Sequence, residues 1–439
     1  MVLKRTVWVY AILSALLFSL RSPVWPEEYK KSDREWVKGL LQIVASDVQR
    51  HYYDPNLHGV DWEALVRRAD DNIEKASSIN DAISEIAAVL DSLNDSHTFF
   101  IPSPRAYVHD YGFDMKMIDS HCYVIRVEPG SDAQKKGLKL GDEITAVNKH
   151  RVSRSAYWRL KYMYEVLQPQ TALGLTLKDD AGSDRELTVS AKDEPSSHIR
   201  YVWPGGINHL LRDIDRENDL MRVRYFSKGK NLLAAKMPGI VYSPLEADRI
   251  LGRMRKHKAV VLDLRGTPGA PETLSRLLGG LFETDLKVYD RIGRRSVQSV
   301  TVSGRRHHAF MGKLAVLIDS NSMSYSEVFA RVVQLQRRGF IIGDHTAGRV
   351  MEAKDYTHKT YVDALVLFGT SISVADLRMT DGKSLEHVGV EPDVQVLPTA
   401  ADLANGRDPA MAKAARLLGV TVTPEEAGAM FPYKGSTEH

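Results

Sequence analysis

Residues Leu314-Ala-Val-Leu-Ile-Asp-Ser-Asn-Ser-Met-Ser324 join a continuous apolar run to a polar turn, and a segment with apolar residues at helical spacing follows. A run that is apolar at every position is typical of a strand buried on both faces. The pattern also occurs earlier, where Ala259-Val-Val-Leu-Asp-Leu264 precedes the turn Arg265-Gly-Thr-Pro-Gly-Ala270 and a segment opened by Pro271. Two strand–turn–helix units in succession imply right-handed crossovers, so the sequence predicts an α/β core with parallel strands.

These two turns are where we expect chemistry, because sites in such sheets gather beyond the carboxyl ends of the strands, near helix N-termini. Ser324 lies at one helix start. A serine becomes a nucleophile only when a base takes its proton, and the oxyanion that forms needs donors placed in advance. The N–H of Tyr325 and that of Gly269 or Ala270 are the candidate oxyanion donors. A serine at a helix start is more often a cap than a nucleophile, so position alone does not decide.

Composition narrows the class of protein. The 439 residues are 43% hydrophobic and 26% charged, which allows several globular domains. The net charge is only +3 and no long basic block occurs, so nucleic acid is not an expected partner. The single Cys122 excludes a disulfide framework and a multi-thiolate zinc site. His307, His308 and His345 lack the carboxylate or thiol spacing of a metal cluster, so neither a metal nor another cofactor is predicted.

The first 27 residues have the pattern of an export signal. Lys4 and Arg5 precede about fifteen mostly apolar residues that end at Leu20, fewer than the roughly twenty of a membrane span. We therefore predict a signal peptide at residues 1–27, with an uncleaved N-terminal membrane anchor as the alternative. Either reading predicts an exported protein, periplasmic or otherwise extracytoplasmic.

Residues 28–103 are predicted to be a helical region. Ser32-Asp-Arg-Glu35 has the spacing of a capping box, and the helix it opens should end near Asp54-Pro55. Two more helices follow. The third runs into Leu93-Asn-Asp-Ser-His-Thr98, a polar turn in which Ser96 and His97 are adjacent.

Residues 104–195 change to short strands and turns. The run from Pro129 to Asn148, PGSDAQKKGLKLGDEITAVN, resembles a PDZ domain. The resemblance implies that a loop at Tyr111, Gly112 and Phe113 holds a peptide carboxylate by its backbone N–H groups, while a helix within 153–167 lines the groove. The alternative is a spacer module with a blocked groove.

Beyond the leader, nearly the whole chain resembles the S41 serine peptidases, the carboxyl-terminal processing or tail-specific group, with relatives of the tricorn core. The resemblance implies an α/β core of ClpP/crotonase-like fold at 196–400. In the remaining segment, 401–439, the apolar spacing of Pro409 to Leu418 predicts a small amphipathic helix followed by a tail. The motifs occur in family order: Leu93–Thr98 for LxDxHT, the PDZ-like run, Asp263–Ala270 for DLRxNxGG, Ser322–Glu327 for SxSxxE, Gly343–Gly348 for GxxTxG and Glu386–Asp393 for EGxGVxPD.

The resemblance also assigns roles. It implies that Ser324 is the nucleophile. Tail-specific members use as base a lysine directly after the last glycine of GxxTxG, but Arg349 stands there, and arginine stays protonated. The tricorn-like branch uses a histidine held by a serine and a glutamate, which implies His97 as base with Ser96 and Glu386 behind it.

The sequence thus predicts an exported serine endopeptidase that acts on protein or peptide substrates, with a PDZ domain that presents or gates a peptide tail. The alternative is a catalytically degenerate relative that binds peptides or lipid-like ligands. Three departures from the family motifs support that alternative: Arg349, Thr267 for an asparagine, and Ala270 for a glycine.

Overall fold

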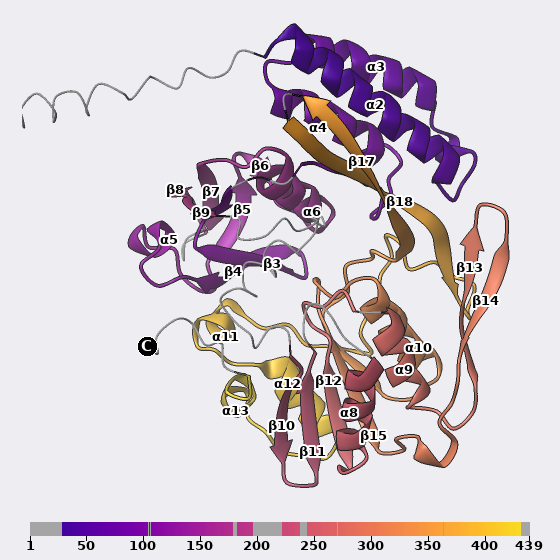
Figure 1. The fold of residues 1–439 in the computed structure, drawn as a ribbon. Coiled ribbons are helices and arrows are strands. Elements are labelled where there is room, and N and C mark those ends of the chain that lie inside the picture. The colour runs from indigo at the N-terminus through magenta and orange to yellow at the C-terminus, as the bar shows by residue number, and fades with distance from the viewer. Residues whose placement is uncertain are drawn as a thin grey trace, which may run out of the picture.

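The computed structural model describes residues 29–103, 105, 107–178, 182–195, 222–237, 244–269, 271–362 and 364–431. It consists of a helical region, a β-rich body and an α/β core, and Figure 1 shows these as three groups of elements. The predicted leader at residues 1–27 lies outside the described residues. Within the described part, no helix is long and apolar enough to cross a membrane.

The α/β core is built on a six-stranded sheet that contains both predicted buried strands. β12 and β15 are neighbours and run parallel, with Val261 opposite Ala315. Both are buried along nearly their whole length. The sheet order is β10 (Arg224–Lys228), β11 (Leu232–Lys236), β12 (Ala259–Asp263), β15 (Lys313–Ile318), β16 (Phe340–Gly343) and β19 (Val394–Gln395), with only β10 antiparallel to its neighbour. The predicted α/β class with parallel strands is confirmed.

Helices cover both faces of this sheet, which explains the continuous apolar strands. Val260 and Leu262 of β12 belong to one buried cluster, and Val261 belongs to another on the opposite face. Each fully buried aliphatic side chain contributes roughly 1.5–3 kcal/mol to stability. The first cluster includes α8 (Pro244–Met254), α9 (Pro271–Gly279) and α10 (Tyr325–Leu335), and the second includes α12 (Pro409–Leu417) and α13 (Pro424–Gly428); a short α11 (Ala400–Ala404) precedes them.

The helical region consists of α2 (Lys31–His51), α3 (Trp62–Lys75) and α4 (Ile79–Asp91), with a short 3-10 turn at Leu57–Gly59. The predicted capping box at Ser32 and Glu35 is wrong by two residues. Lys30 is the N-cap, and the Asp33 carboxylate accepts a hydrogen bond from its N–H at 2.8 Å. α2 also ends at His51, before the predicted stop near Pro55, because Tyr52 leaves the helical conformation.

A second sheet ties the helices to the core. Its order is β1 (Phe99–Ile101), β18 (Ala364–Met379), β13 (Leu286–Gly293) and β14 (Val297–Val302), and β17 (Met351–Val362) also pairs with β18. The long β17–β18 hairpin runs from the core to the helices (Figure 1). β1 pairs with β18 directly after the polar turn that ends the helical region, so this pairing holds that turn against the core.

The β-rich body forms its own sheet, ordered β3 (Phe113–Ile118), β4 (His121–Val127), β5 (Glu143–Val147), β7 (Ala172–Lys178) and β8 (Asp184–Ser190), with β6 (His150–Arg151) beside β5. β2 (Tyr107–Asp110) and β9 (Lys192–Pro195) pair where the chain enters and leaves. The body also contains α5 (Asp132–Lys135), the predicted groove helix as α6 (Arg154–Tyr162) and a π-helical turn at Met163–Leu167.

Candidate active site

Ser324 lies between the end of β15 and the start of α10, in a strained conformation. Its φ is 55° and its ψ is −124°, a region that residues other than glycine seldom adopt. Such strain costs about 1–3 kcal/mol and concentrates at functional sites. The N–H of Ser324 donates to the Glu327 carboxylate at 3.0 Å and to the Arg349 carbonyl at 2.9 Å, and these bonds hold the residue in place.

Glu327 organises the turns around Ser324. Its buried carboxylate also accepts hydrogen bonds from the Thr346 hydroxyl at 2.6 Å and from the N–H groups of Gly348 and Arg349 at 2.8 and 3.0 Å. Burial raises the pKa of Glu327 to about 7, while these donors favour the charged form. The glutamate of the SxSxxE motif thus joins the helix start to the GxxTxG segment.

Ser96, His97 and Glu386 form a hydrogen-bonded chain, although 290 residues separate Ser96 from Glu386. The Ser96 hydroxyl lies 2.8 Å from His97 Nδ1 and donates to Glu386 Oε2 at 2.9 Å. Glu386 also accepts from the N–H groups of Ser96 and Val350, each at 2.8 Å. Because the Ser96 proton goes to the carboxylate, Ser96 accepts from His97 Nδ1–H. This leaves Nε2 unprotonated, the tautomer that a general base needs.

His97 is buried, with 5% of its surface exposed. Burial, and after it the nearby Arg349 charge, lower the pKa of His97 from 6.5 to about 3. Burial also raises the pKa of Glu386, and the Asp95 charge adds to the effect. The imidazole is therefore neutral at ordinary pH.

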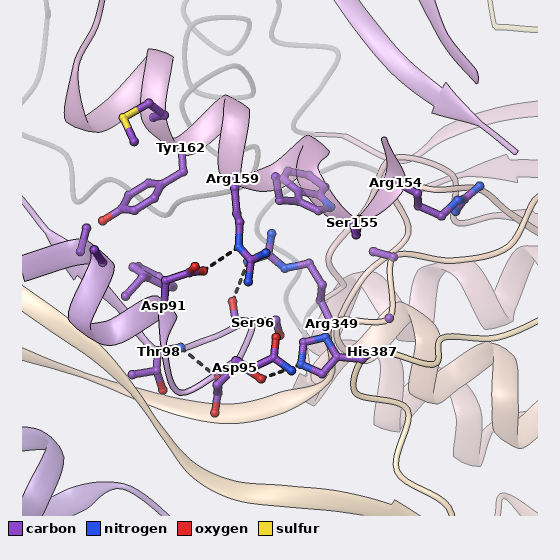
Figure 2. Close-up of a pocket in the computed structure, with 18 of the residues that line it drawn as sticks. Asp91, Asp95, Ser96, Thr98, Arg154, Ser155, Arg159, Tyr162, Arg349 and His387 are labelled. Atoms are coloured by element: carbon purple, nitrogen blue, oxygen red, sulfur yellow. Dashed lines mark hydrogen bonds and ion pairs between the residues drawn. The ribbon is translucent and has the colours of Figure 1, made fainter. Parts of the chain in front are cut away.

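Arg349 extends its side chain to the histidine turn, the polar turn Leu93–Thr98 that contains His97. Its guanidinium donates to the Ser96 carbonyl at 2.6 Å (Figure 2). It also lies 4.9 Å from the centre of the Trp158 ring on α6. Its own carbonyl accepts from Ser324 in the serine turn, Asp319–Ser324 between β15 and α10, so one residue contacts the serine turn, the histidine turn and the β-rich body.

The predicted oxyanion donors have different surroundings. Tyr325 is the first residue of α10, where the N–H groups of a helix have no partner within it. The Gly269 N–H donates to the Thr267 hydroxyl at 3.2 Å, so here it is already engaged. Gly269 has a φ of +74°, and a Cβ there would lie 2.8 Å from the Ser326 nitrogen, which makes glycine necessary. Ala270 lies outside the described residues.

Sequence reasoning missed two carboxylates that shape the site. Asp95 Oδ1 accepts from the N–H groups of His97 and Thr98 at 2.8 and 3.1 Å, which fixes the histidine turn. Asp319 accepts from the Gly266 N–H at 2.9 Å and pairs with Lys116 of β3 at 3.1 Å. An aspartate two residues before a turn residue is a signal for such a turn and could have identified Asp95.

The predicted peptide-binding loop lies at the start of β3. The Gly112 N–H donates to Asp110 at 2.9 Å, the Tyr111 hydroxyl donates to the Gln170 carbonyl at 2.8 Å, and Phe113 is buried.

The β3 edge is engaged beyond this loop. The Met115 carbonyl accepts from the Tyr157 hydroxyl of α6 at 2.6 Å, and the Met117 carbonyl accepts from the Ser320 hydroxyl in the serine turn. Two outward-facing acceptors of this strand are therefore in use.

Comparisons with known proteins agree with this architecture. Residues 241–396 match the model of peptidase family S41, and residues 110–190 match that of a PDZ domain. Among relatives, the chain is 26% identical to the tail-specific protease of Haemophilus influenzae, over 68% of this chain and 43% of that protein. It is 23% identical to the chloroplastic C-terminal processing peptidase of Tetradesmus obliquus, over 80% of this chain and 76% of that protein. It thus spans under half of the first of these proteins.

Solved structures share the fold. Mature CPAF superposes with a TM-score of 0.64 at 13% identity, over 85% of this chain and 95% of that one. The photosystem II D1 C-terminal processing protease gives a TM-score of 0.51 at 16% identity, over 89% and 99%.

Fold and site together define an α/β protein with a strained serine at a strand-to-helix turn, a histidine–serine–glutamate chain and an attached β-rich module. The core matches peptidase family S41 over residues 241–396, and the β-rich module matches a PDZ domain over residues 110–190, so the resemblance that the sequence motifs predicted is confirmed.

Proposed function

We propose that this protein is a serine endopeptidase that uses Ser324 as nucleophile and His97 as general base. The observation that carries the proposal is the hydrogen-bonded chain from His97 through Ser96 to Glu386, which fixes the base tautomer of the imidazole. The strained backbone of Ser324 at a helix start supports its role as nucleophile. Arg349 cannot replace the family lysine, because a guanidinium does not give up its proton in this range.

In the proposed reaction, the Ser324 oxygen attacks the peptide carbonyl carbon while its proton passes to His97 Nε2. The Ser96–Glu386 pair stabilises the imidazolium that forms. When the tetrahedral intermediate collapses, the C–N bond breaks and His97 gives its proton to the leaving amine. His97 then takes a proton from water, which attacks the acyl-enzyme carbonyl. The ester bond breaks, and His97 returns the proton to the Ser324 oxygen.

The Tyr325 N–H is the proposed first oxyanion donor, at the positive end of α10. A second donor from Gly269 requires its N–H to leave the Thr267 hydroxyl, and Ala270 is the alternative. The described arrangement is therefore consistent with a resting state in which the oxyanion site is not fully assembled.

The PDZ domain is proposed to gate the site as well as to bind a peptide tail. A peptide that adds to the β3 edge needs the carbonyls of Met115 and Met117, which Tyr157 and Ser320 now occupy. Tail binding at this edge would therefore compete with docking of the domain on the serine turn. Together with the predicted leader, this suggests a peptidase for exported polypeptides.

A fluorophosphonate probe tests the proposal directly. The activated Ser324 oxygen should displace fluoride and form a bond to phosphorus, so mass spectrometry should find the label on the peptide that contains Ser324. The same chain should cleave an unfolded protein substrate. If neither labelling nor cleavage occurs while peptides still bind, the binding-only alternative is favoured.

Cleavage should persist well below pH 6.5. Protonation of His97 removes the base, and its pKa is lowered to about 3, so the rate should fall only as the pH approaches that lower value. Arg349→Gln removes a positive charge, so the pKa of His97 should rise and the acid limb of kcat/KM should move toward 6.5. Arg276→Gln, at an exposed pair with Asp248, is the matched control. An acid limb near 6.5 in the unmutated protein, unchanged by Arg349→Gln, would contradict this expectation.

A further inference from the structure

A cavity of about 710 Å³ lies where the helical region, the PDZ domain and the core meet. Figure 2 shows its walls, which come from α4, the histidine turn, α6 and the segment 345–349. Among the described residues, Ser96 and Arg349 line it, whereas Ser324 and His97 do not. The cavity thus lies beside the proposed active site, and its volume is in the range of small-molecule sites.

Much of the cavity wall is apolar or aromatic. Helix α4 supplies small side chains on one side, and α6 with the following turn supplies large ones on the other. These are Ala87 and Ala88 of α4, and Trp158, Tyr162, Met163 and Leu167 of α6 and its turn; Phe99 of β1 adds a further aromatic ring. Such a wall favours a ligand with an apolar body.

Most charged groups that line the cavity already have partners. Asp91 pairs with Arg159 at 2.8 Å, and Arg154 pairs with Asp344 at 2.7 Å. Asp95 accepts hydrogen bonds from two backbone N–H groups and from the hydroxyls of Tyr52 and Ser373. None of these groups requires a ligand to satisfy it.

Arg349 differs from these groups. Its guanidinium carries five N–H donors and makes one hydrogen bond among the described residues, to the Ser96 carbonyl, while one face lies over Trp158. Within the described part of the chain, no carboxylate lies within ion-pair distance of it. Burial lowers the pKa of Arg349, and the more distant charges of Glu386, Glu327 and Asp95 offset this only in part. The guanidinium is partly buried, lines the cavity and has no carboxylate at contact distance among the described residues, so the geometry favours an anion in the cavity.

We propose that this cavity binds an apolar ligand that ends in a carboxylate, with the carboxylate on the Arg349 guanidinium and the apolar body between α4 and α6. A planar guanidinium that stacks on an aromatic ring keeps its edge N–H groups available for bidentate pairing with a carboxylate. A peptide with a free apolar C-terminus and a fatty acid share this chemistry. The site is distinct from the Tyr111–Phe113 loop of the PDZ domain.

Occupancy of the cavity would also affect the base, a consequence that rests on the proposed function. The Arg349 charge lowers the pKa of His97, so a carboxylate on Arg349 offsets that charge and strengthens the imidazole as a base. The ligand would therefore activate cleavage as well as bind.

Calorimetry on the full chain carrying Ser324→Ala tests binding without turnover, so a loss of peptidase activity would not affect the result. The probes are an acetylated tetrapeptide that ends in Leu-Ala with a free carboxylate, its C-terminal amide, decanoate and decanol. The free acids should bind about tenfold or more tightly than their neutral counterparts, as expected for charge-assisted hydrogen bonds. Whichever free acid binds more tightly, the tetrapeptide or decanoate, identifies the source of the ligand.

Arg349→Gln should abolish the preference for the acid, whereas Arg159→Gln should keep it, because Arg159 lines the same cavity but is paired with Asp91. Equal binding of acid and neutral probes by the unmutated cavity overturns the proposal, and this comparison needs no Arg349 variant to fold. An acid preference that survives Arg349→Gln also overturns it and points to the PDZ loop instead.

Discussion

Ser324→Ala is expected to lower the rate of peptide cleavage by on the order of 10⁴ to 10⁶ while the protein stays folded. The substitution removes the only atom that the proposed mechanism allows to attack the carbonyl. The loss should appear in kcat, because the substrate still binds. The small remaining rate would come from whatever oxyanion donors and binding contacts persist.

Ser326→Ala is the matched control for this variant. Ser326 lies two residues further along the same helix start, and its hydroxyl is buried without a hydrogen-bond partner among the described residues. Its removal leaves no group unsatisfied, so activity should stay within about twofold and stability should not fall. If Ser324→Ala cleaves as well as Ser326→Ala, the nucleophile lies elsewhere. Ser322 is a poorer control because its hydroxyl donates to the Leu264 carbonyl at 2.8 Å.

The architecture of the core could be predicted because its signals are local. The runs at Ala259–Asp263 and Lys313–Ile318 are apolar at nearly every position, which only a strand covered on both faces explains. Helix ends were less predictable. The capping-box spacing at Ser32 matched a motif, but Asp33 accepts the bond from the Lys30 N–H and so begins the helix two residues earlier. Competing polar residues in one turn make such starts ambiguous.

The candidate site could be predicted only where motifs name residues. The meeting of Ser96, His97 and Glu386 depends on the pairing of β1 with β18, a long-range contact that no local pattern encodes. The sequence showed that Arg349 cannot be a base, yet it gave no direction for its side chain. The cavity beside Arg349 is formed by three separate parts of the chain, so it became visible only in the structure.

His97→Ala is expected to reduce kcat by nearly as much as Ser324→Ala, because an un-ionised serine is a poor nucleophile. Glu386→Gln should reduce kcat less, with a loss about two orders of magnitude smaller than that of Ser324→Ala, since Glu386 only orients and stabilises the imidazole. His121→Ala is the control: His121 is exposed on the PDZ domain and pairs with Glu143 at 2.8 Å, so cleavage should be unchanged.

The double variant separates a shared mechanism from two independent defects. If Ser324 and His97 act as a unit, Ser324→Ala with His97→Ala should be no slower than either single variant, because the second change removes a function already lost. Additive losses would mean that His97 acts through folding, which thermal unfolding of each variant would show. Retained cleavage in His97→Ala, with loss only in Arg349→Ala, would exclude the histidine base. It would instead assign the essential contact to the guanidinium that joins Ser96 to the serine turn.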